Sequence, residues 1–156
     1  MGTPPRHPDA RIAVLIGYFE QLGPADLARI DAIYAPDAAF KDPFNEVRGT
    51  AAIAAIFAHM FETMTAPRFI VRDAVAQGDD CFLTWDFVFE STALAKAPDG
   101  TSRQCIRGAS HLRLDPTGRI AMHRDYWDAA EELYARLPLI GALMRWLRRR
   151  LATPGR

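Results

Sequence analysis

The stretch YAPDAAFKDPF at residues 34–44 interrupts the helical first third of the chain with a short extended segment. Before this stretch, apolar residues recur at three- and four-residue spacing, which is typical of amphipathic helices. Pro36 ends that pattern because proline lacks the backbone N–H that a helix interior requires. Residues 38–42 are expected to be extended, and Pro43 closes them because proline disfavours helix in the residue before it.

Three helices are expected around this stretch. The first begins at Asp9, which suits an N-cap, and Gly23-Pro24 ends it and opens the second. The apolar residues that define these two helices are Ile12, Leu15, Ile16, Phe19, Leu22, Leu27, Ile30, Ile33 and Tyr34. The third helix is expected over about residues 50–64, and Pro67 ends the helical part of the chain.

The sequence that follows is typical of long strands joined by tight turns. Strands are expected at residues 69–77, 81–96, 102–114 and 119–127. In the second of these, alternate apolar residues share one face, namely Leu83, Trp85, Phe87 and Phe89. Helices followed by hairpin-linked strands predict an α+β domain, in which three N-terminal helices cover one face of a curved antiparallel sheet.

After residue 127 the helical period returns, and Pro138 and Gly141 are expected to break it into two pieces. The sequence therefore predicts three parts. Residues 1–8 are expected to form a flexible leader, residues 9–128 a single domain, and residues 129–156 an amphipathic helical extension.

The formal net charge of the 156 residues is zero, yet the charges are unevenly distributed. Residues 143–156 contain five arginines and no acidic residue, so they sum to +5 and the rest of the chain to −5. A nucleic-acid partner is therefore not expected. Cys81 and Cys105 have neither disulfide-framework nor metal-ligand spacing, which favours reduced thiols in a cytoplasmic protein. No apolar run approaches the roughly 18 residues that a membrane span needs.

Three short blocks lie in order along residues 9–128. They are Gly17-Tyr18-Phe19-Glu20; residues 34–44 with Arg48-Gly49; and Leu112-Arg113-Leu114-Asp115 with Gly118-Arg119-Ile120 and Tyr126-Trp127. In order and spacing, the blocks resemble the nuclear transport factor 2-like superfamily, which includes ketosteroid isomerase and the SnoaL-like polyketide cyclases. The resemblance implies a cone-shaped sheet whose mouth is closed by helices around a deep apolar pocket. Because such folds serve catalysts and binding modules alike, the fold alone does not give the function.

The resemblance to ketosteroid isomerase implies a general base at Asp42 and an oxyanion-binding hydroxyl at Tyr18. Asp42 lies between Phe40 and Phe44, and an acid in apolar surroundings can exchange protons with a bound substrate. A phenol can donate one short hydrogen bond in a dry pocket. Two alternatives stay open. Asp42 could cap the Asp-Pro turn, and Tyr18 could be a core residue with a backbone partner.

The same resemblance places the third isomerase residue, a protonated aspartate, at Ser110. Serine is a weaker donor than that acid. The difference argues against true ketosteroid isomerase activity and leaves carbonyl binding possible.

Alternation along the last strand places His123, Asp125 and Trp127 on one face. Trp127 matches a pocket-lining tryptophan of the isomerases, so the resemblance implies that this face points inward. An inward carboxylate at Asp125 resembles the acid/base aspartate of SnoaL-like cyclases. In the alternative, Asp125 forms a salt bridge at the rim of the cone with Arg107 or Arg124.

The remaining histidines and Asp86 are weaker candidates. His111 has the opposite parity from Ser110, so it is expected to face outward, and only a bulge would pair it with Asp125. A metal site built from His111, His123 and Asp125 is therefore not expected, and neither is a cofactor. His59 and Asp86 are expected to be satisfied surface or rim residues. Motifs for phosphate binding, serine hydrolysis or zinc proteolysis do not occur.

These observations favour a SnoaL-like protein that binds a small hydrophobic carbonyl compound and transfers a proton without a cofactor. Asp42 or Asp125 would be the base and Tyr18 the oxyanion donor, and the substrate-binding residues would be Trp127, His123, Ser110 and Phe44. A non-catalytic binding or assembly module is the alternative. The resemblance also favours a homodimer formed through the outer sheet.

The arginine-rich extension is expected to pack on the mouth of the cone or on a partner subunit. Contact of its helix with an anionic membrane surface is the alternative that the sequence leaves open.

Overall fold

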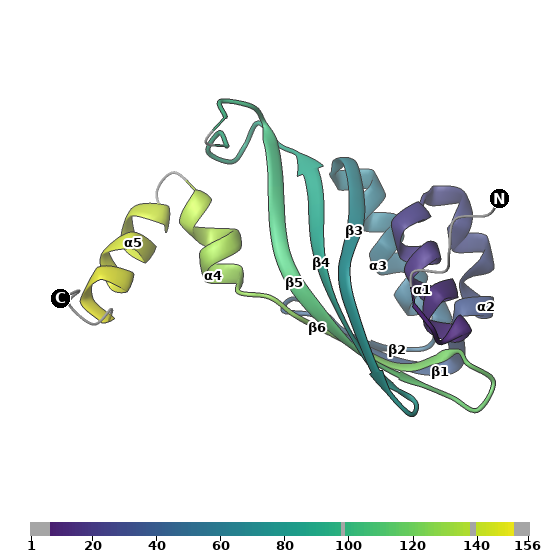
Figure 1. The fold of residues 1–156 in the computed structure, drawn as a ribbon. Coiled ribbons are helices and arrows are strands. Elements are labelled where there is room, and N and C mark those ends of the chain that lie inside the picture. Colours follow the sequence, from purple (N-terminus) through teal and green to yellow (C-terminus); the bar gives the residue numbers. More distant parts are fainter. Residues whose placement is uncertain (1–6, 98, 138–139, 152–156) are drawn as a thin grey trace.

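A curved six-stranded sheet forms the centre of the protein, and the N-terminal helices lie on its concave side (Figure 1). The computed structural model describes residues 7–97, 99–137 and 140–151. The helices are α1 (Ala10–Gln21), η1 (Pro24–Arg29), α2 (Ile30–Ile33), α3 (Thr50–Thr63), α4 (Ala129–Glu132), η2 (Tyr134–Arg136) and α5 (Ile140–Leu151). The strands are β1 (Tyr34–Lys41), β2 (Glu46–Arg48), β3 (Thr65–Gln77), β4 (Asp80–Glu90), β5 (Arg103–Leu114) and β6 (Ile120–Tyr126). Most of the expected leader and Pro138 lie outside the described residues.

The strand order in the sheet is β2-β1-β6-β5-β4-β3. The expected α+β fold with a curved antiparallel sheet is confirmed, with one addition. β1 runs parallel to β6, and Phe40 lies opposite His123. Parallel neighbours are joined by a long connection rather than a tight turn, so no hairpin signal in the sequence announces this pair.

Two prolines lie inside strands, and both shift the expected boundaries. β1 begins at Tyr34, which the sequence places on the second helix, and the pairing of β1 with β6 is irregular between Tyr34 and Ala39. β3 begins at Thr65 and includes Pro67, at a similar irregularity in its pairing with β4. A proline without an N–H is tolerated at a bulge or on an edge strand, and β3 is an edge strand.

The strand expected at residues 81–96 leaves the sheet early, at Glu90. The loop that follows is held by backbone hydrogen bonds, including Ser91 N–H to Ser102 O at 2.9 Å and Ala95 N–H to Arg136 O at 3.1 Å. The second bond joins this loop to η2. β2 is a short strand that the sequence analysis did not predict.

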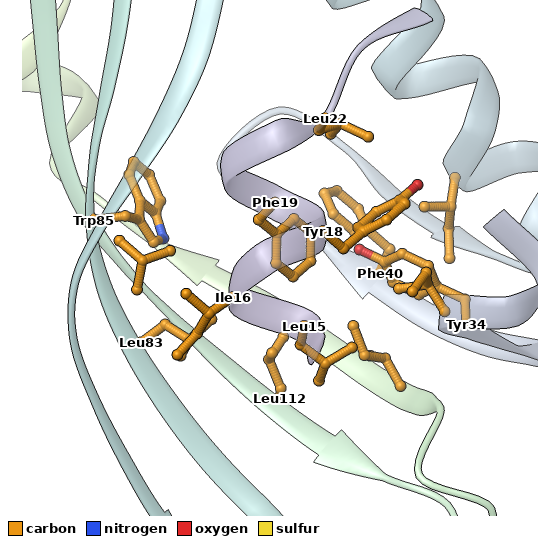
Figure 2. Close-up of a cluster of buried hydrophobic side chains, with 14 of the residues drawn as sticks. Leu15, Ile16, Tyr18, Phe19, Leu22, Tyr34, Phe40, Leu83, Trp85 and Leu112 are labelled. Carbon is orange, nitrogen blue, oxygen red and sulfur yellow. The ribbon is translucent and has the colours of Figure 1, made fainter. Parts of the chain in front are cut away.

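Helix α1 lies across the concave face and supplies much of the core. Asp9 caps its first turn as expected, since its carboxylate accepts a hydrogen bond from Arg11 N–H at 2.9 Å. Figure 2 shows Ile16 and Phe19 on the side of α1 that faces Leu83 and Trp85. The alternation predicted for β4 is confirmed because Leu83, Trp85, Phe87 and Phe89 are all buried.

α5 stands apart from the body of the cone, whereas α4 lies beside β5 (Figure 1). α5 lies mainly against η2, which precedes it in the chain. Within residues 7–97, 99–137 and 140–151, no helix is both long and apolar enough to cross a membrane.

Candidate functional site

An apolar cavity of about 650 Å³ opens between α3 and the concave face of the sheet. Its walls are mostly aromatic rings and aliphatic or methionine side chains. They include Phe57, Met60, Met64, Phe69, Phe87, Phe89 and Ile106. Leu94, from the loop after β4, and Leu133, next to α4, also line the cavity. Such a volume and lining are typical of a site for a small organic molecule.

Asp125, on β6, lines this cavity. Its side chain is 16% exposed. The Oδ1 atom accepts hydrogen bonds from Ser110 O–H at 2.5 Å and from His123 Nε2 at 2.7 Å. Among the described residues, no hydrogen bond is made to Oδ2. Asp125 thus has one oxygen fixed by side-chain donors and one available to a ligand.

His123 is held on its other side by Tyr34, the first residue of β1. The hydroxyl of Tyr34 lies 2.7 Å from Nδ1 of His123, and the Tyr34 side chain is fully buried. Burial, and next the charge of Asp125, raise the pKa of Tyr34 well above 10, so this hydroxyl keeps its proton. The carboxylate of Asp125 accepts from Nε2–H of His123, so Nδ1 of the neutral imidazole accepts the hydrogen bond that Tyr34 O–H donates.

Ser110 is fixed by Trp85, from the neighbouring strand β4. The indole N–H of Trp85 donates to Ser110 Oγ at 2.8 Å, so the serine proton is directed to Asp125. Gly108 lies opposite Trp85 in the sheet, and a Cβ there would stand 2.3 Å from the indole ring. A glycine is thus needed for the indole to lie close to β5. The polar groups form one continuous chain, Tyr34–His123–Asp125–Ser110–Trp85.

A second, water-sized chamber of about 20 Å³ adjoins this chain. Ser110, His123 and Asp125 form its polar side, and Phe19, Phe57 and Leu83 are among its apolar walls. The ring of Phe40 also packs edge-on against His123, with a centroid distance of 4.8 Å. Tyr34, His123, Ser110 and Trp85 are therefore buried, and Asp125 and Trp85 also line the large cavity.

Asp42 also lines the cavity, but its carboxylate is used in the turn after β1. Its Oδ1 accepts hydrogen bonds from the backbone N–H groups of Phe44 at 2.7 Å and Asn45 at 2.6 Å. The turn-capping alternative is therefore observed. Phe44 is 55% exposed, and its ring stands edge-on to Trp127, with 5.5 Å between centroids. Both rings line the cavity.

Tyr18 lies away from this cavity. Figure 2 shows its hydroxyl on the opposite side of α1 from Trp85. The side chain is buried, and its hydroxyl has no hydrogen-bond partner among the described residues. Burial raises the pKa of Tyr18 to about 12. The structure thus brings Asp125, His123 and Ser110 together and leaves Tyr18 apart from them.

His111 faces the convex side of the sheet, as its parity predicts. Its Nε2 lies 2.7 Å from Asp80, and its ring stacks on Phe82 at 4.3 Å, so the pairing with Asp125 that a bulge would allow does not form. His111 therefore cannot share a metal ion with His123 and Asp125. Asp86 is bound by Arg72 at 2.5 Å, while His59 lines the cavity.

The rim salt bridge considered for Asp125 does not form. Arg107 instead faces Glu132 at 3.6 Å, and the Arg124 guanidinium lies over the Tyr126 ring. Sequence reasoning missed Tyr34 and Trp85 as members of the site. A signal for Trp85 existed, since alternation placed it on the inward face of its strand. Tyr34 had no such signal because the parallel pairing of β1 with β6 was not predicted.

Solved structures similar to this chain share its fold. A SnoaL-like protein from Jannaschia sp. CCS1 has a TM-score of 0.68 and 15% identity, covering 88% of this chain and 97% of that one. A protein with a ketosteroid isomerase-like fold from Catenulispora acidiphila, in complex with trimethylamine, has a TM-score of 0.65 and 16% identity, covering 83% and 95%. An LEH-like epoxide hydrolase from M. tuberculosis has a TM-score of 0.60 and 17% identity, covering 88% and 92%.

A comparison with proteins of curated function found no match to this sequence. The sequence profile of the SnoaL-like domain, in contrast, matches residues 15–123. That range begins within α1, includes the whole of β5 and ends at the His123 position on β6. The chain therefore belongs to the SnoaL-like domain family.

Proposed function

We propose that this protein binds a small hydrophobic carbonyl compound and moves one of its protons without a cofactor. The observation that carries the proposal is the position of Asp125, whose carboxylate meets an apolar cavity and uses only Oδ1 in hydrogen bonds to described residues. The rings and methionines of the cavity would hold the hydrocarbon part of the compound by apolar contact. The carbonyl end would lie toward Asp125.

In the proposed reaction, Oδ2 of Asp125 removes a proton from the carbon next to the carbonyl. The electron pair of that C–H bond moves into an enolate, and the carboxyl group then returns the proton to the same or a conjugated carbon. No electrons leave or enter the substrate. Ser110 and His123 hold Oδ1 in place, so the carboxylate need not reorient during proton transfer.

The enolate oxygen needs a hydrogen-bond donor within the cavity. Tyr18, the donor expected from the family resemblance, does not line it. Trp127 lines the cavity together with Asp125 and carries an indole N–H. We assign the donor role to Trp127 on this basis.

The test is deuterium exchange at the α-carbon of a panel of hydrophobic enolisable ketones, followed by mass spectrometry. Asp125→Asn keeps the shape of the side chain and removes the base, so it is expected to lower the exchange rate by about 10²–10⁴-fold. Asp42→Asn is the matched control because Asp42 lines the same cavity. An undiminished rate in Asp125→Asn overturns the mechanism, and an equal loss confined to Asp42→Asn assigns the base to Asp42.

Binding without chemistry is the second candidate, and the predominantly apolar lining of the cavity favours it. Native mass spectrometry of the purified protein would detect a small apolar molecule that remains bound. A bound molecule without α-proton exchange in any ketone of the panel favours the binding module. Exchange that depends on Asp125 favours the enzyme.

We also propose a homodimer formed through the convex face of the sheet. Val75, Phe82 and Tyr126 are 69%, 50% and 48% exposed, although all three are large apolar or aromatic side chains. Asp80 and Arg113 place both charge signs on the same face, as a self-complementary twofold contact needs. Light scattering should give twice the chain mass for the wild type and a monomer mass for Phe82→Glu.

A further inference from the structure

α5 carries its own unpartnered surface, separate from the cavity. The helix extends from the body of the protein with η2 as its main contact (Figure 1). Ile140, Leu143 and Trp146 are 47%, 53% and 46% exposed, so its apolar side chains are not covered by the cone. Leu133 of the extension lines the cavity, but among the described residues α5 itself does not pack on the cone.

All the charged residues of α5 are basic. Its sequence, IGALMRWLRRRL, contains four arginines, and the chain has no acidic residue after Glu132. The guanidinium of Arg150 lies over the Trp146 ring, 5.0 Å from its centroid. Arg149 and Arg150 form no ion pair with a carboxylate of the described residues. Within the described residues, the charges of Arg149 and Arg150 are therefore not compensated by a carboxylate.

Exposed apolar side chains, a tryptophan and uncompensated arginines on one helix match the chemistry of an interfacial membrane helix. The apolar side chains can enter the acyl boundary, tryptophan suits the headgroup level, and the arginines can bind lipid phosphates. A contact between α5 helices of two copies offers a weaker match, because both helices are basic. We propose that α5 binds an anionic lipid surface.

η2, the element that α5 contacts, is held to the sheet by side-chain hydrogen bonds. The buried carboxylate of Glu132 pairs with Arg136 at 3.0 Å, and Arg136 also donates to Gln104 of β5 at 3.1 Å. These contacts hold η2 close to Leu133, which lines the cavity. The inference does not depend on the proposed chemistry.

The test is sedimentation of the full chain with vesicles of phosphatidylcholine, alone or mixed with an equimolar amount of phosphatidylglycerol. Binding is expected only to the mixed vesicles and should weaken in high salt. Arg149→Glu/Arg150→Glu is expected to lower the partition constant by on the order of thirtyfold or more, at about a fivefold loss for each arginine removed. Arg68→Glu/Arg103→Glu, two exposed arginines elsewhere, is the charge-matched control and should bind nearly as the wild type does.

A second pair of variants tests the apolar part of the contact. Leu143→Ser should weaken binding several-fold, while Val14→Ser, an exposed apolar residue on α1, should not. Equal binding to both kinds of vesicle, or equal loss in the α5 and control variants, overturns the proposal. So does a Leu143→Ser protein that keeps vesicle binding but changes its mass in light scattering, because α5 would then be a subunit contact.

Discussion

Tyr18 and Tyr34 are both buried tyrosines of the N-terminal third, and they differ in what their hydroxyl groups meet. Tyr34 donates to His123 and so belongs to the chain that ends at Asp125. Tyr18 has no partner among the described residues. Burial raises the pKa of both phenols. Burial alone therefore does not make a tyrosine part of the site. Tyr34 belongs to it because β1 pairs with β6, which carries His123.

The largest effect is expected from Tyr34→Phe. The substitution leaves Nδ1 of a buried histidine without its donor, which should lower the free energy of unfolding by about 1–3 kcal/mol. It also frees the imidazole that holds Asp125, so the rate of α-proton exchange should fall, and its pH profile should shift. Urea unfolding and ketone exchange at several pH values measure the two effects.

Ser110→Ala separates the two routes by which Asp125 is held. It removes one donor to Oδ1 but leaves the link from His123 to Tyr34 intact. If Tyr34 acts through His123, the pH profile of the α-proton exchange rate shifts in Tyr34→Phe. The same profile does not shift in Tyr18→Phe. The same profile in Tyr34→Phe and wild type contradicts a positioning role for Tyr34.

An intermediate effect is expected at alkaline pH. A tyrosine with a raised pKa keeps its proton in the folded protein after the unfolded chain has lost it near pH 10. The free energy of unfolding is therefore unaffected by tyrosine titration below pH 10 and declines above it, by up to about 1.4 kcal/mol per pH unit for each tyrosine.

Urea unfolding over a pH series measures this decline. Burial raises the pKa of Cys81 to about 11, so its thiol adds a loss of the same sign that begins near pH 9. The informative quantity is thus the difference between each variant and the wild type in how steeply the free energy of unfolding declines with pH. Tyr34→Phe and Tyr18→Phe should each show a shallower decline above pH 10 than the wild type. Parallel curves for all three proteins would refute the assigned pKa shifts.

Local patterns predicted much of this fold. The N-cap at Asp9 and the alternation along β4 depend on residues a few positions apart, and the structure agrees with both. The alternation along β6 likewise puts His123 and Asp125 on one face. The predicted starts of β1 and β3 were wrong at Pro36 and Pro67. A proline that stops a helix can also lie in a strand at a bulge or an edge.

The site was harder to predict than the fold because its contacts join strands that are far apart in the sequence. Tyr34 and His123 are 89 positions apart and meet through a parallel pair of strands. Trp85 reaches Ser110 only because the register of β4 and β5 sets Gly108 under the indole ring. The residue pattern of a single strand shows neither which strand it pairs with nor the register of that pair.

The smallest effect is expected from Tyr18→Phe, and this substitution is expected to stabilise the protein. A buried hydroxyl without a partner loses its hydrogen bonds to water on folding and gains none in return. Its removal should therefore raise the free energy of unfolding, by about 1 kcal/mol, and leave ketone exchange unchanged. Paired urea unfolding and exchange measurements check both. A fall in stability would mean that the hydroxyl has a partner, and a fall in exchange with unchanged stability would return Tyr18 to the oxyanion role that the family resemblance implies.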